Sequence, residues 1–182
     1  MSLVPKKVFF VKGIGHHKSK LVAFELALRN AGIEKYNLVN VSSILPPHCI
    51  EVSKEEGCKQ LRPGQIVYTV LSRVDSNKLN QKICASIGIA KPSDKNQYGY
   101  LSEHHRYDAK PEEVGKYTEE TAAEMLATIL GIDFDPEADY DEKREVFKMG
   151  GKIVETKHIT EHATSKKEEE WASVVVAAVF IL

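Results

Sequence analysis

The C-terminal segment places the strongest limit on what this chain can fold into. Residues 174–182 form an unbroken apolar run that is rich in valine. As a helix this run would be too short to cross a bilayer, which takes about 20 apolar residues. An unbroken apolar run of this kind is instead typical of a strand that is covered on both faces. We therefore expect residues 171–182 to close the core as a strand inside a layered fold.

The remaining patterns predict about seven strands and three helices in one domain, residues 1–182. With 182 residues and 42% apolar composition, the chain can bury the core of a single folding unit. The predicted helices are 18–31, 53–61 and 111–130, and the predicted strands are 7–11, 37–41, 65–72, 83–90, 97–105, 152–164 and 171–182. Because strands and helices do not alternate regularly, we expect an α+β sandwich with sheets inside and helices outside.

Composition disfavours several classes of function. A net charge of −1 argues against general binding to nucleic acid or to anionic membranes, because phosphate affinity comes largely from clustered Lys and Arg. Cys49, Cys58 and Cys84 lack the spacing of a zinc site or a disulfide framework and indicate reduced thiols. Together with an N-terminus that lacks the apolar core of a signal peptide, they favour a cytoplasmic protein.

Three patterns that could suggest a ligand are incomplete. Residues 12–17 place two glycines in a turn between a predicted strand and a predicted helix, but the third glycine of a dinucleotide fingerprint and the Lys-Ser/Thr of a P-loop are missing. The adjacent His16 and His17 cannot share one helical face. The acidic, loop-like segment 133–145 lacks the spacing of an EF-hand loop. We expect neither a nucleotide site nor a metal site.

A strand pattern runs into two serines and then into two prolines in residues 37–47, Asn-Leu-Val-Asn-Val-Ser-Ser-Ile-Leu-Pro-Pro. Proline has no backbone N–H and disfavours helix at the residue before it, so the chain must turn here. The hydroxyl groups of Ser42 and Ser43 therefore lie at a bend. An isolated Ser-Ser-x-x-Pro is most often only a polar turn. The whole string is more specific, because it resembles the self-cleavage region of the pyruvoyl-dependent arginine decarboxylases.

This resemblance, which extends from Lys7 to the terminal apolar strand, implies a fold, a cofactor and a reaction. The implied fold is an αββα sandwich. The chain would cut itself between Ser42 and Ser43 into a short β chain, 1–42, and an α chain, 43–182, that begins with a pyruvoyl group made from Ser43. The implied reaction is decarboxylation of L-arginine to agmatine and carbon dioxide through a Schiff base on that group, a step of polyamine biosynthesis.

The chemistry of self-cleavage explains why a serine is required. Its hydroxyl can attack the preceding carbonyl and convert the Ser42–Ser43 amide into an ester, provided that nearby donors hold the oxyanion. Loss of the Ser43 α-proton then eliminates the Ser42 carboxylate and leaves dehydroalanine, which hydrolyses to pyruvoyl and ammonia. The product is a ketone at a new chain terminus, and it can accept the electrons released with carbon dioxide.

A polar strand end carries the predicted proton donor. Within residues 97–105, Gly99 and Glu103 match a family pattern in which the glutamate donates the proton that replaces carbon dioxide. His104 and His105 are alternative donors, because imidazole titrates near neutral pH, although a solvated rim is the preferred interpretation of both. Strand alternation predicts Glu103 and His105 on one face and His104 on the other. A glutamate that donates a proton near neutral pH requires a desolvated site.

The helix that precedes the serine string carries the predicted specificity residue. Its apolar residues recur at helical spacing and predict a buried face made of Leu21, Phe24, Leu28 and Ala31. Glu25 falls about 40° from Leu21, at the margin of this face, where a solvated carboxylate is the ordinary interpretation. The resemblance implies instead that an acidic residue here binds the substrate guanidinium. The family more often has Asp at this position.

Asn37 matches a family asparagine that is tied to processing and catalysis. It lies six positions before Ser43, which in a straight strand corresponds to about 20 Å. Either the chain bends sharply between the two residues, or Asn37 acts on the Ser43 of a neighbouring subunit. The resemblance implies a homotrimer with a site shared at each interface, which favours the second arrangement. It also assigns Ser42 to substrate binding beside the cofactor.

Two other classes of function remain open on the residues alone. A cofactor-independent serine hydrolase would use Ser43 with a histidine such as His105 and would leave the chain intact. A non-catalytic binding protein would also stay intact and would show no carbonyl reactivity. Only the pyruvoyl hypothesis requires two fragments.

Overall fold

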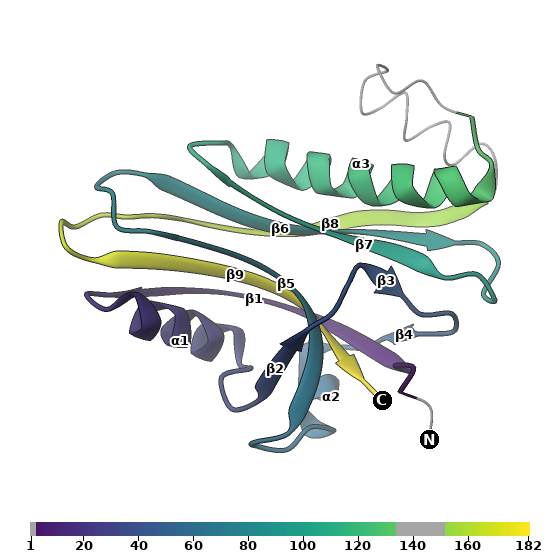
Figure 1. Cartoon of the computed structure of the whole chain (residues 1–182), viewed down its shortest axis with the longest axis horizontal. Helices are drawn as coiled ribbons and strands as arrows, with labels where there is room; N and C mark the ends of the chain where they lie inside the picture. The colour runs from purple at the N-terminus through teal and green to yellow at the C-terminus, as the bar shows by residue number, and fades with distance from the viewer. Residues whose placement is uncertain (1–2, 134–151) are drawn as a thin grey trace.

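The computed structural model describes residues 3–133 and 152–182, which form two stacked β-sheets with a helix on each outer face (Figure 1). The strand order of the five-stranded sheet is β2 (Asn37–Asn40), β5 (Ile66–Ser76), β9 (Trp171–Ile181), β1 (Lys7–His17) and β4 (Ile50–Glu51). The order of the four-stranded sheet is β3 (Ile44–Leu45), β7 (Gly99–Tyr107), β6 (Lys82–Pro92) and β8 (Ile153–Thr164). The helices are α1 (Lys20–Ala31), α2 (Lys54–Lys59) and α3 (Pro111–Leu130).

This architecture confirms the predicted αββα sandwich. Figure 1 shows α3 against the outer face of the four-stranded sheet and α1 against the outer face of the five-stranded sheet. The C-terminal strand β9 is covered on both faces, as its apolar run predicts. Val174 and Val176 belong to the core between the two sheets, whereas Val175 and Ala177 belong to the core beneath α1.

The predicted turn at residues 12–17 is wrong, because β1 continues without a break to His17. Its two glycines lie directly beneath α1. A Cβ atom added at Gly13 would overlap the carbonyl oxygen of Ala27, and one added at Gly15 would overlap the carbonyl oxygen of Ala23. These glycines therefore allow a helix to pack closely on the sheet.

The same close packing corrects the predicted buried face of α1. The residues that α1 buries are Ala23, Ala27 and Ala31, one per turn. Leu21, which was expected in the apolar face, is 73% exposed. Only small side chains fit where the helix meets the glycines of β1, so the larger apolar residues are displaced to the margins of the helix.

The cysteines and the helices bear on two further expectations, and a third falls outside the described residues. Cys49, Cys58 and Cys84 are free. None of the helices in residues 3–133 and 152–182 combines the length and the apolar character that a membrane span needs. The predicted acidic loop, 133–145, lies outside the described residues apart from its first position.

Candidate active site

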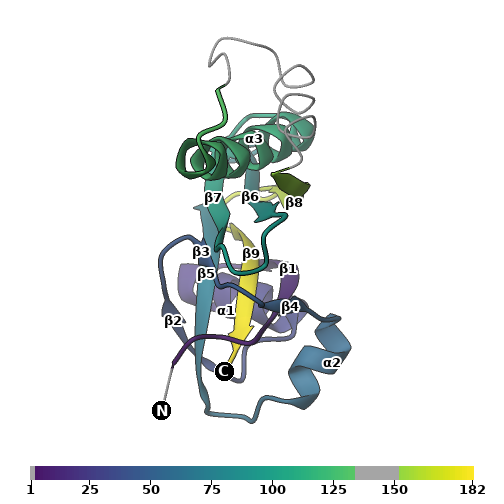
Figure 2. The same cartoon turned by 90° about the vertical axis from the view of Figure 1, so that its right-hand side faces the viewer.

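The Ser42–Ser43 bond lies where the chain passes from one sheet to the other. β2 pairs with β5 in the five-stranded sheet, whereas β3 pairs with β7 in the four-stranded sheet. Figure 2 shows these four strands along the same side of the sandwich. We call residues 41–43, which join β2 to β3, the crossover.

Backbone hydrogen bonds hold both ends of the crossover. The N–H of Val41 donates to the carbonyl of Thr69 on β5 at 2.9 Å, and the N–H of Leu101 on β7 donates to the carbonyl of Ser43 at 2.7 Å. β2 pairs with β5 only as far as Thr69, and β3 pairs with β7 only as far as Tyr100. Among the described residues, no other strand pairs with β5 or β7 on this side, so both continue with an open edge.

Two contacts at the crossover bear on its chemistry. The N–H of Ile44 donates to the carbonyl oxygen of Ser42 at 3.1 Å, across Ser43. The hydroxyl of Ser43 donates to Oε2 of Glu103 at 3.2 Å. The first contact polarises the Ser42 carbonyl, and the second directs the Ser43 proton toward a carboxylate. Ser43 is half-buried, whereas Ser42 is exposed.

A cavity of about 740 Å³ lies beside the crossover, between the open edges of β5 and β7. Apolar side chains of α1, β2 and β5 contribute one part of its wall. Its polar wall consists of Asn37, Asn40, Ser72, Arg73, Glu103 and His105. The volume is within the range of small-molecule sites. The sequence-predicted residues Asn37 and Glu103 thus line one cavity, and Glu103 is the residue that contacts Ser43.

The strand alternation predicted for β7 is confirmed. Glu103 and His105 both line the cavity. His104 faces α3, where its ring centroid lies 4.7 Å from that of Tyr117 and its Nε2 accepts a hydrogen bond from Arg106. Burial and the charge of Arg106 lower the pKa of His104. Glu103 is exposed to solvent in the described chain.

The two asparagines of β2 are held by hydrogen bonds at the cavity wall. Nδ2 of Asn37 donates to the carbonyl of Gly64 at 2.7 Å, and Oδ1 of Asn40 accepts from the hydroxyl of Thr69 at 3.2 Å. Sequence reasoning missed Asn40, because strict strand alternation assigns positions three apart to opposite faces. The chain leaves β2 directly after Asn40, which frees this side chain from the alternation.

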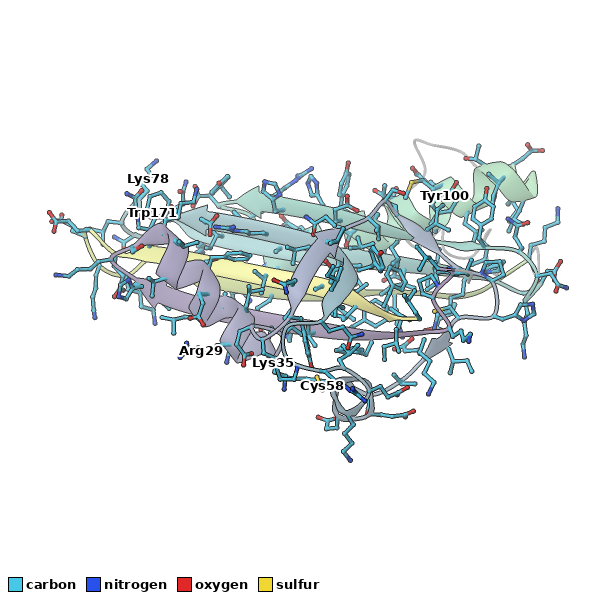
Figure 3. The ribbon with its side chains drawn as sticks, turned by 60° about the horizontal axis from the view of Figure 1, so that its bottom comes forward. Arg29, Lys35, Cys58, Lys78, Tyr100 and Trp171 are labelled. Atoms are coloured by element: carbon cyan, nitrogen blue, oxygen red, sulfur yellow. The ribbon has the colours of Figure 1, made fainter. Side chains whose placement is uncertain are left out.

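Glu25 is not brought to the cavity within one chain. Its Oε1 accepts hydrogen bonds from Nε and Nη2 of Arg29, each at 2.8 Å, one helical turn further along α1. Figure 3 shows Arg29 far from Tyr100, whose backbone pairs with Ile44 next to Ser43. Phe24 and Leu28 are the residues of α1 that line the cavity.

Arg73 is a charged cavity residue that sequence reasoning missed. Its guanidinium carbon lies 3.6 Å from the centroid of the Phe24 ring, and its Nε donates to both carboxylate oxygens of Asp75 at 2.9 and 3.2 Å. The cavity wall therefore carries a guanidinium that is stacked on an aromatic ring and paired with a carboxylate. The pattern of β5 predicts a strand but gives no sign of this stacking, because Phe24 comes from α1.

A second hollow, of about 500 Å³, lies on the other side of the crossover. Its wall is mostly apolar and includes Val41, Ile44, Pro46, Tyr68 and Phe180, with Ser42 at the crossover. Leu3 and Val4, from the beginning of the described chain, also contribute to the wall and are themselves exposed. Ser42 thus belongs to the wall of this hollow, whereas Ser43 reaches the larger cavity through its contact with Glu103.

Comparisons with known proteins agree on one family. The sequence profile of the family described as "Pyruvoyl-dependent arginine decarboxylase" matches residues 7–182. A protein of Chlorobaculum tepidum named "Probable pyruvoyl-dependent arginine decarboxylase" is 54% identical over 181 residues, covering 100% of this chain and 99% of the relative. A Methanococcoides burtonii protein named "Pyruvoyl-dependent arginine decarboxylase" is 50% identical over 180 residues, covering 99% of this chain and 100% of the relative.

Proposed function

Because the chain belongs to the pyruvoyl-dependent arginine decarboxylase family, we propose that it cuts itself between Ser42 and Ser43 and decarboxylates L-arginine to agmatine and carbon dioxide. The observation that carries this proposal is the pair of contacts at the crossover. One amide N–H already donates to the carbonyl of Ser42, and one carboxylate already accepts from the hydroxyl of Ser43. The reaction would serve polyamine biosynthesis.

In the proposed self-cleavage each of these groups has a role. Oγ of Ser43 attacks the carbonyl carbon of Ser42 while the Glu103 carboxylate accepts its proton. The developing oxyanion is stabilised by the Ile44 N–H. The proton then passes to the Ser43 nitrogen as the amide C–N bond breaks, which leaves an ester. Removal of the Ser43 α-proton next expels the Ser42 carboxylate, and addition of water releases ammonia.

The residues around position 43 fit a pyruvoyl group. Position 43 is half-buried, is within hydrogen-bonding reach of Glu103 and lies beside a cavity large enough for an amino acid. When formed, this group supplies a ketone that binds the substrate amine covalently and accepts the electrons released with carbon dioxide. Glu103 then delivers a proton to the carbon that carried the carboxylate. Asn37 supplies amide groups at the same cavity wall, and Ser42 ends the upstream fragment beside it.

A homotrimer with the site shared at each interface completes the proposal. Glu103 is exposed in one chain, so another copy is needed to exclude water from it. The apolar side chains of Val39, Val41 and Ile44 are also exposed around the crossover. Burying them against a second copy would stabilise the assembly and enclose the cavity at the same time.

The same assembly would give Glu25 a role that one chain does not give it. A carboxylate can accept two parallel hydrogen bonds from a planar guanidinium, whereas an ammonium acts as a point charge. Glu25 already binds such a group, because Arg29 is its partner. We expect Glu25 to exchange this internal partner for the guanidinium of arginine bound in a neighbouring site.

A cytoplasmic location is part of the proposal and agrees with the three free cysteines.

Denaturing mass spectrometry tests the proposal directly. The wild-type chain should separate into fragments 1–42 and 43–182, the second carrying a pyruvoyl group. Ser43→Ala should remain one chain and lose decarboxylation, whereas Ser43→Cys should retain slow cleavage because a thiol can also attack. Ser42→Ala is the matched control and should still be cut, because the attacked carbonyl is preserved. A wild-type protein that stays a single intact chain would contradict the proposal. If that intact protein has hydrolase activity, it would favour the serine hydrolase, and if it has no activity, it would favour the binding protein.

A further inference from the structure

Ser72 connects the two sheets of the sandwich through a buried hydrogen bond. It lies on β5 of the five-stranded sheet and is 2% exposed. Its hydroxyl donates a hydrogen bond of 2.6 Å to the carbonyl of His104 on β7, in the four-stranded sheet. A buried hydroxyl on the inner face of one sheet is thus joined to the backbone of the other.

This bond lies at the candidate proton donor. His104 stands between Glu103 and His105, and both of these neighbours line the cavity that Ser72 also lines. The backbone that Ser72 holds is therefore the backbone that directs the Glu103 side chain. The carboxylate of Glu103 is in turn the group that contacts Ser43.

The strand needs such support at this point. β3 pairs with β7 only through Gly99 and Tyr100, and the next contact is the hydrogen bond from Leu101 to the crossover. Beyond it, within the described residues, β6 is the only strand that pairs with the Glu103 segment of β7. A strand that is paired on one side can shift more easily than one that is paired on both. The hydroxyl of Ser72 limits that movement from the opposing sheet.

We propose that Ser72 is a positioning residue for Glu103: its hydroxyl fixes the β7 backbone so that the carboxylate remains directed at position 43. Ser72 does not itself touch the reacting atoms. This inference rests on the proposed function, because it assumes that Glu103 transfers a proton there. A misplacement of about 1 Å at a reacting group can cost about 10²-fold in rate, so a modest shift of β7 is enough to matter.

The test compares Ser72→Ala with Ser76→Ala. Ser76 lies four positions later on the same strand, is 5% exposed and donates a bond of the same length, 2.6 Å, to Gln81 Oε1. Both variants lose one buried serine hydroxyl. We expect Ser72→Ala to lower kcat for arginine by about 10-fold or more, with KM changed less than about twofold. Ser76→Ala should retain the wild-type kcat, and Ser72→Thr, which keeps a hydroxyl, should recover most of the lost rate.

A double variant separates positioning from a general loss of structure. In the Glu103→Gln background, Ser72→Ala should cost little further in kcat, because the group that it positions is already changed. Additive losses, or equal kcat values for Ser72→Ala and Ser76→Ala, would overturn the inference. If Ser72→Ala does not fold, the nearly isosteric Ser72→Cys, a weaker donor, replaces it, and a wild-type kcat in that variant would also overturn it.

The proposed function and this inference can fail separately. A wild-type protein that neither cuts itself nor decarboxylates arginine would refute the proposed function. A wild-type protein that does both, while Ser72→Ala behaves like its Ser76→Ala control, would refute only the role of Ser72.

Discussion

The two long sides of the sandwich join the same pair of sheets by different means. Along one side, which we call the crossover edge, the chain itself passes from β2 to β3 and Ser72 bonds to β7 (Figure 2). Along the other side, β4 of one sheet meets β6 and β8 of the other through ion pairs. Glu51 and Glu155 each contact both Lys91 and Lys157 at 2.7–2.9 Å. We call these four residues the charged edge.

The carboxylates at the two edges differ in how they are paired, which assigns the charged edge to stability and the crossover edge to the proposed chemistry. At the charged edge every carboxylate contacts two ammonium groups, so its charge is matched within the protein. At the crossover edge, within the part of the chain that the structure describes, the Glu103 carboxylate contacts Ser43 at 3.2 Å and is otherwise exposed. In the proposed function Glu103 exchanges a proton, and two ammonium groups beside it would oppose this by favouring its ionised form. A substitution at the crossover edge should therefore lower kcat, whereas a substitution at the charged edge should lower the free energy of unfolding and leave kcat unchanged.

The largest effect is expected from Glu103→Gln at the crossover edge. Its kcat for arginine should fall by about 10²-fold or more, the usual contribution of a general acid, because an amide does not deliver the proton. Self-cleavage should be slower but retained at least in part, since the amide oxygen can still orient the Ser43 hydroxyl by accepting its hydrogen bond, although it cannot take the proton. The measurement is steady-state decarboxylation, together with the fragment masses. Wild-type turnover in Glu103→Gln, combined with a lost rate in His105→Ala, would assign the acid to His105.

Glu25→Gln tests whether a residue that belongs to neither edge within one chain contributes to the site of a neighbouring copy. If it reaches a neighbouring site, kcat/KM for arginine should fall by about 10²-fold while self-cleavage stays intact. Arg29→Gln is the control, because it removes the internal partner of Glu25 and should leave arginine binding unchanged or tighter. Kinetics with arginine and lysine measure both variants. Unchanged arginine kinetics in Glu25→Gln would transfer specificity to another acidic residue.

Glu51→Gln should have the smallest effect and should leave catalysis unchanged. The side chains of Glu51 and Lys157 are about one-third exposed, so solvent screens their attraction and the loss of unfolding free energy should be about 1 kcal/mol. Chemical denaturation measures it. Glu56→Gln, which breaks a longer and more exposed contact of 3.6 Å with Lys7, is the matched control and should change stability less. A loss of kcat in Glu51→Gln would refute the separation between the edges.

The pH dependence of this effect follows from the direction of two pKa shifts. Burial alone would raise the pKa of Glu51 and of Glu155, but hydrogen bonds and charge from Lys157 and Lys91 outweigh it and hold both pKa values below the usual value. Their stabilisation is therefore present above the unfolded pKa of about 4.3 and is lost as pH falls through the lowered folded values. The stability gap between wild type and Glu51→Gln should narrow from pH 7 toward pH 3.

Sequence patterns predicted the parts of the structure that local chemistry determines. The apolar run of β9 and the Ser-Ser-x-x-Pro string are both patterns of residues that are close together in the sequence. The seating of α1 was mispredicted, because the alanine face follows from Gly13 and Gly15 on another element. The charged edge was not predicted at all, because Glu51 and Lys157 are 106 positions apart in sequence. Arg73 and Ser72 were missed because their partners, Phe24 and His104, are also distant in the sequence.

The position of β1 has a consequence for refolding. All eleven residues of β1 pair with β9, so the proposed fragment 1–42 would supply a strand between β9 and β4, both of which belong to fragment 43–182. Once cut, the two pieces would stay together only through noncovalent contacts, and denaturation would release them as separate molecules. Renaturation would then become a bimolecular reaction whose yield depends on protein concentration. Folding of the uncut chain would need no such encounter between fragments, so we expect the proposed cut to follow folding.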